Sequence, residues 1–480
     1  MNDRIPDTLA ACRLLVDGEW MDGRGTPFPV MDKYHLAPAM QAGSADRAQL
    51  AAAIDAAQAA FKRGAPNPYE RGMILERAAA LVEARAKDFI RTMQVEAGFT
   101  ESDGAGEHRR AVQTLRLSGE EARRLAGDVI PLAGAPQQGN RMGFTLRVPL
   151  GVIAAITPFN APINTVSHKI APAFAAGNAT VLKPSTHTPL SACLLAQCLL
   201  EAGMPKGFLN IVHGGAEVAD WLLEDPRVRF FAFTGSTEVG RSIQQRAGLR
   251  RTQMELGSIA FTIVSDDANV EMAIPKIINA GFRKAGQVCT SVQMLLVHRS
   301  RFAEVEELLT EKVKALPFGD PMDPKTVVGP LISEHAATRV EAWIEEAVAK
   351  GAKRLAGGPR AGAVIPPTLL KDVDDSMKVG CREVFGPLVN LVPFDTLDEA
   401  IARVNATPYG LATGLFTNRL DDAFSAAKKL EVGGVHVNET SSSRVDLMPY
   451  GGSKDSGFGR EGPRYAIHEM TEERIVTFTL

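Results

Sequence analysis

Between residues 151 and 235 the sequence alternates β-prone runs with helical patterns, and this alternation restricts the possible folds more than any other feature. The β-prone runs are GVIAAITPF, NATVLKPS, FLNIVHG and RFFAFTG, and segments with helical patterns separate them. Strands joined by single helices pair in parallel, because the helix crosses back over one face of the sheet. The pattern therefore predicts an α/β fold built on a parallel sheet.

A second alternation follows in the C-terminal half of the chain. FTIVSD, MLLVHRS, VNLVPFD and GLATGLFTN are β-prone, and helices are expected up to Ala285 and from Arg301. At 480 residues the chain also exceeds the size at which one hydrophobic core stops growing. We therefore expect two large α/β lobes with a cleft.

The N-terminal region and the tail complete the expected architecture. Residues 44–86 predict two helices, capped near Ser44 and broken at residues 64–69, and a further helix is expected over residues 106–126. Proline and glycine separate two β-prone pieces in residues 129–149, which is typical of a hairpin. The tail RIVTFTL is expected to pair with this hairpin or with the edge of a neighbouring subunit.

Charge and cysteine content restrict the possible partners. The formal net charge is −3 and no long run of like charges occurs, so neither a nucleic acid nor a membrane is an expected partner. The five cysteines form no CxxC pair, which argues against a disulfide framework and against a zinc site. No secretory signal and no long apolar run is seen, so we expect a cytoplasmic protein that binds a small molecule and no metal.

The single GxGxxG string, formed by Gly457, Gly459 and Gly462, is not expected to bind a dinucleotide. No apolar strand precedes it, and no acidic residue follows about twenty residues later, as a dinucleotide site requires. A role in a turn or in a crowded stretch of backbone is the better interpretation.

Cys289 is the candidate nucleophile. It lies in KAGQVCTSVQ, between an expected helix and the strand MLLVHRS, where a loop of small residues would expose its sulfur to a cleft. Taken alone, a buried and inert thiol would be the better interpretation, because free cysteines usually pack as hydrophobic residues. Two other strings change this estimate.

Asn160 and Glu255 carry groups that oxidation of an aldehyde by a thiol requires. Asn160, in ITPFNAP, offers an amide that stabilises the oxyanion formed when a thiolate adds to a carbonyl; the alternative is a cap for a helix starting near Pro162. Glu255, in QMELGS, ends an apolar strand, where burial would raise its pKa toward that of a general base; the alternative is a surface carboxylate.

These strings resemble those of the aldehyde dehydrogenase superfamily, and the resemblance covers essentially the whole chain. It places the family's catalytic cysteine on Cys289, its general base on Glu255 and its oxyanion asparagine on Asn160. The resemblance implies that thiolate attack gives a hemithioacetal, that hydride passes to the nicotinamide of NAD or NADP, and that Glu255 activates the water that hydrolyses the thioester.

The resemblance also implies a fold with two Rossmann-like α/β domains and a small β oligomerisation arm. The dinucleotide-binding domain is expected at residues 1–126 and 148–255, and the catalytic domain at residues 256–445. The arm and C-terminal segment are expected at residues 127–147 and 446–480, in a homodimer or homotetramer.

Cofactor positions are carried over from the same resemblance. It implies that Lys183 bonds the adenosine ribose, Ser236 the pyrophosphate and Glu383 the nicotinamide ribose, while Glu461 relays protons. The other expected cofactor residues are Thr157, Pro158, Phe159, Ser185, Thr186, Gly235, Gly240, Leu256, Gly257 and Phe385.

Three positions depart from the family pattern. Thr186 stands where many NAD-preferring members have glutamate, and the loss of that carboxylate removes repulsion against the 2′-phosphate of NADP. Ser258 replaces a glycine, which would alter placement of the nicotinamide, and Ala161 replaces an aromatic residue, which would widen the substrate tunnel.

Arg110 and Arg444 are candidate substrate residues. Arg110 lies near the position where some members that accept phosphorylated or carboxylated aldehydes have an arginine. RVDLMPYGG, which contains Arg444, resembles members that act on lactaldehyde-like or phosphonate-bearing aldehydes. A small hydroxylated or anionic aldehyde is therefore the expected substrate, and the alternative is two solvent-facing arginines.

Three other functions stay open from the residues. A CoA-acylating semialdehyde dehydrogenase would transfer the acyl group to CoA, although such relatives commonly lack the base at Glu255. A catalytically silent binding or structural protein on the same fold would not need Cys289, Asn160 and Glu255 together, and a thiol esterase would need no nicotinamide.

Overall fold

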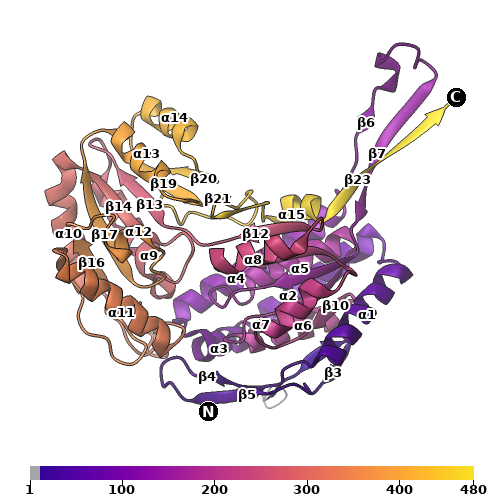
Figure 1. Ribbon diagram of the computed structural model, residues 1–480, viewed down its shortest axis with the longest axis horizontal. Coiled ribbons are helices and arrows are strands. Elements are labelled where there is room, and N and C mark those ends of the chain that lie inside the picture. The colour runs from indigo at the N-terminus through magenta and orange to yellow at the C-terminus, as the bar shows by residue number, and fades with distance from the viewer. Residues whose placement is uncertain (1–10) are drawn as a thin grey trace.

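The computed structural model describes residues 11–480, and it contains two α/β lobes and a projecting arm (Figure 1). Each lobe has its own large sheet and its own hydrophobic core. The expectation of two sheets is therefore confirmed. Residues 1–10, with which the expected dinucleotide-binding domain begins, lie outside the described residues.

The first lobe is built on an eight-stranded sheet whose five central strands run parallel. The β-prone runs of residues 151–235 supply four of those strands, so the expected parallel pairing is confirmed. Three antiparallel strands complete the two edges. In sheet order the strands are β22 (Gly457–Phe458), β12 (Arg251–Glu255), β11 (Val228–Thr234), β8 (Val152–Ile156), β9 (Ala179–Lys183), β10 (Leu209–Ile211), β2 (Leu14–Val16) and β3 (Glu19–Met21).

Helices cover this sheet, and several of them also pack on one another. The crossover helices are α5 (Asn164–Ala176), α6 (Pro189–Glu201), α7 (Ala216–Glu224) and α8 (Thr237–Ala247). The N-terminal helices pack against α5, α6 and α7, and α15 packs on α5. The N-terminal helices are α1 (Arg47–Arg63), α2 (Pro68–Ala84), α3 (Ala86–Ala97) and α4 (Glu101–Ala122), and α15 is Pro463–Glu469. A small sheet contains β1 (Ala11–Cys12), β5 (Pro38–Ala42) and β4 (Phe28–Met31).

The second lobe has a seven-stranded sheet that is parallel except at the β15 edge. Its strands, in sheet order, are β15 (Lys353–Ala356), β16 (Thr368–Lys371), β17 (Leu388–Phe394), β14 (Val292–His298), β13 (Ala260–Val264), β19 (Ala412–Phe416) and β20 (Gly434–Val437). Its helices are α9 (Val270–Phe282), α10 (Phe302–Lys314), α11 (Glu334–Ala349), α12 (Lys378–Cys381), α13 (Leu397–Asn405) and α14 (Leu420–Lys429). The expected domain boundary at residues 255 and 256 falls between β12 and β13, and the division into domains stays a prediction.

The tail pairs with the hairpin, as one of the two sequence interpretations expected. β23 (Thr471–Thr479) runs antiparallel along the whole of β7 (Arg141–Pro149), and β6 (Val129–Ile130) pairs on the other side. This three-stranded arm projects from the first lobe and carries the C-terminus at its tip (Figure 1). Residues 446–470 lie outside the arm, because β22 joins the first sheet and β21 (Ser453–Lys454) pairs with β18 (Tyr409–Gly410).

Two helix starts differ from the sequence expectation. The side chain of Asp46, rather than Ser44, caps α1 by accepting a hydrogen bond from Gln49, whose own side chain bonds back to Asp46. Ser44 instead donates to the carbonyl of His213. Helix α4 begins after Thr100, whose hydroxyl caps it, and not at residue 106. A side chain reaches the first free amides only when backbone geometry allows, which a propensity pattern does not reveal.

The GxGxxG glycines meet crowded backbone, as the sequence interpretation expected. Gly457 has φ +101°, and a Cβ added there would lie 2.1 Å from the carbonyl oxygen of Met254. Gly462 has φ +96°, and its added Cβ would lie 2.5 Å from the oxygen of Met448. Gly457 pairs directly with Glu255 across β22 and β12, so this close approach fixes the strand that carries Glu255.

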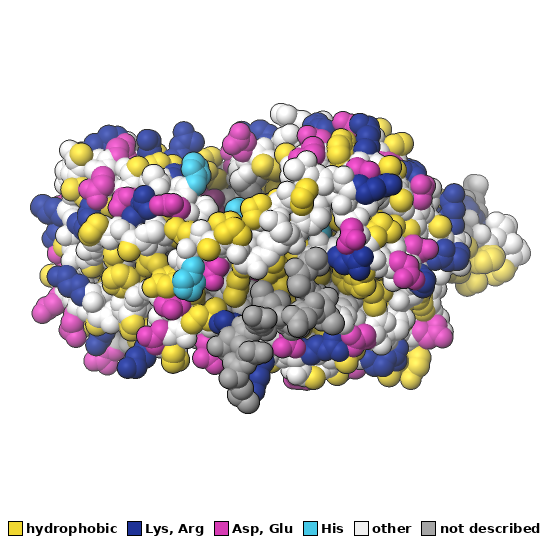
Figure 2. Space-filling model, turned by 90° about the horizontal axis from the view of Figure 1, so that it is seen from below, with side chains coloured by type: hydrophobic (Ala, Val, Ile, Leu, Met, Phe, Trp, Pro, Cys, Tyr) yellow, Lys and Arg dark blue, Asp and Glu magenta, His cyan; other side chains and the backbone are white. Residues whose placement is uncertain are grey.

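On the face that Figure 2 shows, basic and acidic side chains are intermixed, and no region carries charge of a single sign. In the part of the chain that the structure describes, no helix is long and apolar enough to cross a membrane.

Replacing Gly457 by alanine tests the role of this glycine. The added Cβ would require a left-handed backbone and would overlap Met254, so we expect a cost of about 2 kcal/mol or more, seen as a lower Tm. Gly106→Ala is the matched control, since its added Cβ meets nothing within 4 Å on α4 and should stabilise the helix slightly. Equal melting of Gly457→Ala and the wild type would contradict this interpretation.

Candidate active site

A cavity of 810 Å³ lies between the two lobes, and every sequence-predicted site residue except Gly240 and Glu461 lines it. Residues from both the first lobe and the second lobe contribute to its wall. The lining residues expected from the sequence are Arg110, Thr157, Pro158, Phe159, Asn160, Lys183, Ser185, Thr186, Gly235, Ser236, Glu255, Leu256, Gly257, Cys289, Glu383, Phe385 and Arg444. Residues far apart in the chain are thus brought together.

The parallel strands of the first sheet explain how these residues meet. Thr157 follows β8, Lys183 ends β9, Gly235 follows β11 and Glu255 ends β12. These strands are neighbours in the sheet and point the same way, so their carboxyl ends share one edge. Ligand sites of parallel sheets form at that edge.

Gly240 does not line the cavity. A Cβ at this position would lie 2.3 Å from the side chain of Leu256, so the glycine allows α8 to pack closely on the residue after β12. The small size of Gly240 thus serves packing behind the wall, and its expected role in cofactor binding stays a prediction.

Cys289 is brought to the cavity by an unusual turn. Helix α9 ends at Phe282 and not at Ala285, because Lys284 and Ala285 have left-handed backbone angles, with φ of 51° and 52°. Lys284 is buried, donates to the carboxylate of Glu107 at 2.7 Å and to the carbonyl oxygen of Asn160 at 2.8 Å. These bonds tie the loop that carries Cys289 to the first lobe.

The sulfur of Cys289 has two polar neighbours. It lies 3.3 Å from Oε1 of Glu255 and 3.0 Å from the hydroxyl of Tyr450. Burial raises the pKa of the thiol well above its ordinary value, and the Glu255 carboxylate raises it further. The interpretation as an inert core thiol is not favoured, since Cys289 is only partly buried and lines the cavity.

Glu255 is buried, with 4% of its surface exposed, so it is not a surface carboxylate. Burial raises its pKa to about 7, and the nearby carboxylate of Glu461 contributes in the same direction. The hydroxyl of Thr234 lies 3.1 Å from one Glu255 oxygen and 3.4 Å from an oxygen of Glu461, and thus connects the two carboxyl groups. A carboxyl group with such a pKa exchanges protons near neutral pH.

Asn160 does not cap helix α5, whose start has no side-chain cap. Its amide nitrogen donates instead to the carbonyl oxygen of Gln287 at 2.8 Å, two residues before Cys289. An amide group carries two N–H donors, so one remains to face the cavity. The capping alternative is therefore excluded.

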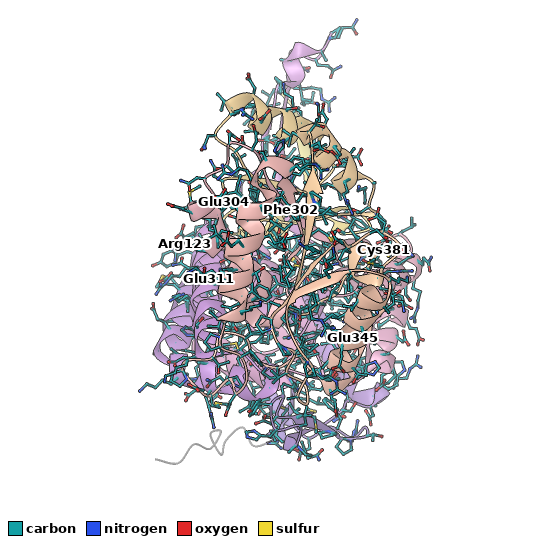
Figure 3. All side chains as sticks on the ribbon, turned by 90° about the vertical axis from the view of Figure 1, so that its left-hand side faces the viewer. Arg123, Phe302, Glu304, Glu311, Glu345 and Cys381 are labelled. Carbon is teal, nitrogen blue, oxygen red and sulfur yellow. The ribbon has the colours of Figure 1, made fainter. Side chains whose placement is uncertain are left out.

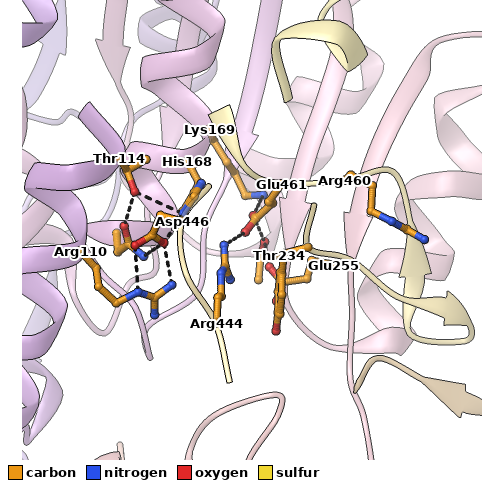
Figure 4. Close-up of polar contacts among 12 residues, drawn as sticks. Arg110, Thr114, His168, Lys169, Thr234, Glu255, Arg444, Asp446, Arg460 and Glu461 are labelled. Carbon is orange, nitrogen blue, oxygen red and sulfur yellow. Dashed lines mark hydrogen bonds and ion pairs between the residues drawn. The ribbon is translucent and has the colours of Figure 1, made fainter. Parts of the chain in front are cut away.

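Glu461 forms the centre of a buried charge cluster behind Glu255 (Figure 4). Lys169, which is fully buried, lies 3.0 Å from one of its oxygens, and Arg444 donates to the other at 2.8 Å. The two cations hold the pKa of Glu461 well below its ordinary value, although burial opposes them. The guanidinium of Arg444 also lies 3.7 Å from the centre of the Tyr450 ring.

Arg110 forms a second cluster with Asp446 (Figure 4). Two guanidinium nitrogens bond the Asp446 carboxylate, at 2.8 and 3.2 Å. His168 Nε2 lies 2.8 Å from the same carboxylate, and Asn164 donates to it at 3.2 Å. Arg110 and Arg444 thus both face the cavity while paired with buried carboxylates, and neither is a solvent-facing arginine.

Arg283, which the sequence analysis did not single out, also lines the cavity. Its guanidinium donates to the hydroxyl of Ser442 at 2.6 Å, and no carboxylate of residues 11–480 forms an ion pair with it. It also lines a neighbouring cavity of 330 Å³, which shares Asn279 and Arg283 with the main one. Arg283 therefore lies where the two cavities meet, and the carboxylate of Asp103 favours its charge without forming an ion pair with it.

The other end of the main cavity contains polar groups without partners. Lys183 is 8% exposed, and its Nζ bonds no described residue; burial lowers its pKa to about 8. The hydroxyl of Thr157 is buried and also without a partner. Ser236 caps the N-terminus of α8, and Glu383 accepts from the amide of Ser258. The amide end of a helix beside a buried lysine is a suitable site for phosphate groups.

Tyr450, Arg283 and Lys284 are the site residues that sequence reasoning missed. Arg283 and Lys284 lie within six residues of Cys289, and that proximity is the signal that would have found them. Tyr450 lies 161 positions from Cys289, and it follows Arg444 in the string already noted, but nothing local indicates its contact with the sulfur.

Comparisons with known proteins agree with this geometry. The model of the aldehyde dehydrogenase family matches residues 20–476. The 3-sulfolactaldehyde dehydrogenase of Priestia aryabhattai is 47% identical over 468 residues, which are 97% of this chain and 98% of that protein.

Solved structures show the same fold. The crystal structure of aldehyde dehydrogenase 21 from Physcomitrella patens, with the reaction product succinate, has a TM-score of 0.95 and 38% identity, and 98% of each chain is covered. That of glyceraldehyde-3-phosphate dehydrogenase from Methanocaldococcus jannaschii, with NADP, has a TM-score of 0.91 and 35% identity, covering 94% of this chain and 99% of the other. The chain therefore belongs to the aldehyde dehydrogenase family, and it is an NAD(P)-dependent aldehyde dehydrogenase.

Proposed function

We propose that this enzyme oxidises a small anionic aldehyde to its carboxylic acid through a thioester on Cys289, which water hydrolyses. The observation that carries the proposal is the distance of 3.3 Å between the sulfur of Cys289 and Oε1 of Glu255, in a cavity that Asn160 and four arginines also line. A nucleophile, a base, an oxyanion donor and an anion anchor are the groups that this reaction needs.

Thioester formation begins with a proton transfer. The thiol proton of Cys289 passes to Glu255, and the sulfur forms a bond to the carbonyl carbon of the aldehyde. The electron pair of the C=O double bond moves to oxygen, where the second N–H of Asn160 donates a hydrogen bond. The nicotinamide of NAD or NADP, when bound, supplies the chemistry of hydride acceptance.

Hydrolysis uses the same carboxyl group as a base. Once Glu255 has lost its proton, it removes one from water, and the resulting hydroxide attacks the thioester carbon. The C–S bond breaks and the sulfur leaves as a thiolate. Thr234 and Glu461 provide a route by which Glu255 exchanges its proton, since one hydroxyl contacts both carboxylates.

The unpartnered groups at the other end of the cavity fit a dinucleotide. Lys183 would bond the adenosine ribose, Ser236 and Gly235 the pyrophosphate, and Glu383 the nicotinamide ribose, beside Phe385. The remaining wall residues there are Thr157, Pro158, Phe159, Ser185, Thr186, Leu256 and Gly257. We propose that NADP is accepted, because Thr186 brings no negative charge against a 2′-phosphate and a solved neighbour is complexed with NADP.

An anionic substrate is supported by charge and by the relatives. Arg110 and Arg444 are already paired with carboxylates, whereas Arg283 has only the hydroxyl of Ser442. A partly buried guanidinium that forms no ion pair within residues 11–480 favours an anionic ligand. The names of the compared proteins mention a sulfonate, a phosphate and the dicarboxylate succinate, and each bears such an anion.

Absorbance of reduced nicotinamide tests the proposed reaction. Wild-type enzyme should reduce NAD or NADP in the presence of an aldehyde and without CoA, and Cys289→Ser should lose at least about 10³-fold of the rate, as expected when a nucleophile is removed. Cys381→Ser, at an exposed position, is the matched control. Turnover that requires CoA would favour an acylating enzyme, ester cleavage without oxidation an esterase, and no turnover a silent protein.

The pH dependence of thioester hydrolysis tests the role of Glu255. Its pKa of about 7 lies above the ordinary value, and only its deprotonated form accepts a proton from water, so hydrolysis should rise as pH increases through about 7. Glu461→Gln removes the carboxylate that raises this pKa, so the midpoint should move to lower pH. Hydrolysis of the acyl-enzyme from a nitrophenyl ester measures this step without a cofactor. A pH-independent rate across that range would refute the assignment.

Replacing Arg283 by methionine tests the anion anchor. We expect the KM for succinic semialdehyde to rise by about 10–100-fold, since a charge-assisted bond contributes about 1.5–3 kcal/mol, while butyraldehyde should be unaffected. Arg241→Met removes an exposed guanidinium on α8, outside the cavity, and should leave both substrates unchanged. Equal losses for the two aldehydes in Arg283→Met would contradict an anion site.

We also propose that the arm mediates assembly into a homodimer or homotetramer. β23 and β7 expose apolar side chains of Met142, Leu146, Ile475 and Phe478, and the arm extends away from its own lobe (Figure 1). A second copy would cover them. A solution mass equal to one chain would contradict this.

A cytoplasmic location stays a proposal, supported by five unpaired cysteines, as a reducing compartment would maintain them.

A further inference from the structure

The thiolate form of Cys289 needs stabilisation that Glu255 and Asn160 do not supply. Attack on an aldehyde requires a sulfur that carries negative charge, yet burial and the neighbouring Glu255 carboxylate both oppose that charge. Transfer of the thiol proton to Glu255 removes the second obstacle but not the first. A hydrogen-bond donor that faces the sulfur would offset the cost of burial.

Tyr450 is placed to be that donor. Its hydroxyl oxygen lies 3.0 Å from the sulfur of Cys289, and the residue is 5% exposed. The single thiol proton is directed to Glu255, so the hydroxyl must be the donor toward the sulfur. Burial raises the pKa of Tyr450 well above its ordinary value, which keeps the hydroxyl protonated.

The position of the Tyr450 ring is fixed from two sides. The guanidinium of Arg444 stacks 3.7 Å from the ring centre, and it is held by Glu461 at 2.8 Å. The backbones of Tyr450 and Glu461 exchange two hydrogen bonds, of 3.1 and 2.7 Å. A cation over an aromatic ring draws electron density from it, which makes a phenol hydroxyl a stronger donor.

We propose that Tyr450 is a catalytic residue whose hydroxyl donates a hydrogen bond to the thiolate of Cys289, and that Arg444 is the positioning residue that orients it. The proposal rests on the proposed thioester function and extends it. The proton of Cys289 goes to Glu255, and Tyr450 keeps its own. When the C–S bond forms, the negative charge leaves the sulfur for the oxygen near Asn160, and the bond from Tyr450 weakens.

The charged and titratable groups around the sulfur come from several elements. Glu255 on β12 disfavours the thiolate, while the cation of Arg444 favours it. The groups that contribute to the electrostatics of Cys289 or of its Glu255 neighbour are Lys169, Arg283, Arg444, Glu255, Tyr450 and Glu461. Tyr450→Phe changes none of these charges, so it isolates the hydrogen bond.

Alkylation of Cys289 by iodoacetamide, followed by peptide mass spectrometry, measures the thiolate directly. In Tyr450→Phe we expect the midpoint of the rate against pH to rise by about one to two units, because hydrogen bonds to charged groups are strong. Tyr465→Phe, on α15 outside the cavity, loses the same hydroxyl and should leave the midpoint unchanged. Cys381, exposed at the surface (Figure 3), is an internal reference for reagent and fold.

A second substitution keeps the test decisive if phenylalanine disturbs folding. A difluorotyrosine at position 450 keeps the shape but is a more acidic phenol, so the midpoint should fall. An unchanged midpoint in either folded variant overturns the role of Tyr450. Alkylation needs neither aldehyde nor nicotinamide, so a shifted midpoint in an enzyme that oxidises no aldehyde would refute the proposed function alone.

Discussion

A carboxylate that is 1% exposed must be compensated, and Glu461 is compensated by Lys169 and Arg444. This buried cluster determines much of the site. It orients Arg444, whose guanidinium covers Tyr450, and the carboxylate of Glu461 adds to the effect of burial in raising the pKa of Glu255 to about 7. Removing one member would leave the others with unpaired charge, so the cluster acts as a unit. The proposed nucleophile, the proposed base and Tyr450 therefore depend on one ion-pair network.

The two lobes are joined at the active site by a second buried pair. Lys284 belongs to the loop that carries Cys289, and Glu107 belongs to α4 of the first lobe. The same ammonium bonds the carbonyl oxygen of Asn160, while the Asn160 amide bonds Gln287. The segments that carry Cys289 and Asn160, the proposed nucleophile and oxyanion donor, are thus held together by these two bonds. Lys284 and Ala285 have left-handed backbone angles, a strained conformation that these hydrogen bonds maintain.

Local pattern was enough to predict the main elements of the fold. Alternating β-prone and helical segments indicated the parallel strands, and the arm followed from glycine and proline between two β-prone pieces. The first and last residues of the helices were harder to predict from the sequence. Asp46 and Thr100 are caps because their side chains reach free amides, and α9 ends early because Lys284 is drawn into an ion pair. Those contacts involve geometry that neighbouring residues do not encode.

Residue type and immediate context were sufficient to propose Cys289, Glu255 and Asn160 as site residues, because a thiol, a carboxyl and an amide in those strings suit one reaction. The distances between these three side chains could not be predicted from the sequence, and neither could the carboxylates that pair with the arginines. Asp446 lies 336 positions from Arg110, and Tyr450 lies 161 positions from Cys289. Folding decides which charged groups form ion pairs and which, like Arg283, face the cavity without an ion pair to any of residues 11–480. Such pairing depends on packing between distant segments, and a linear pattern carries no information about it.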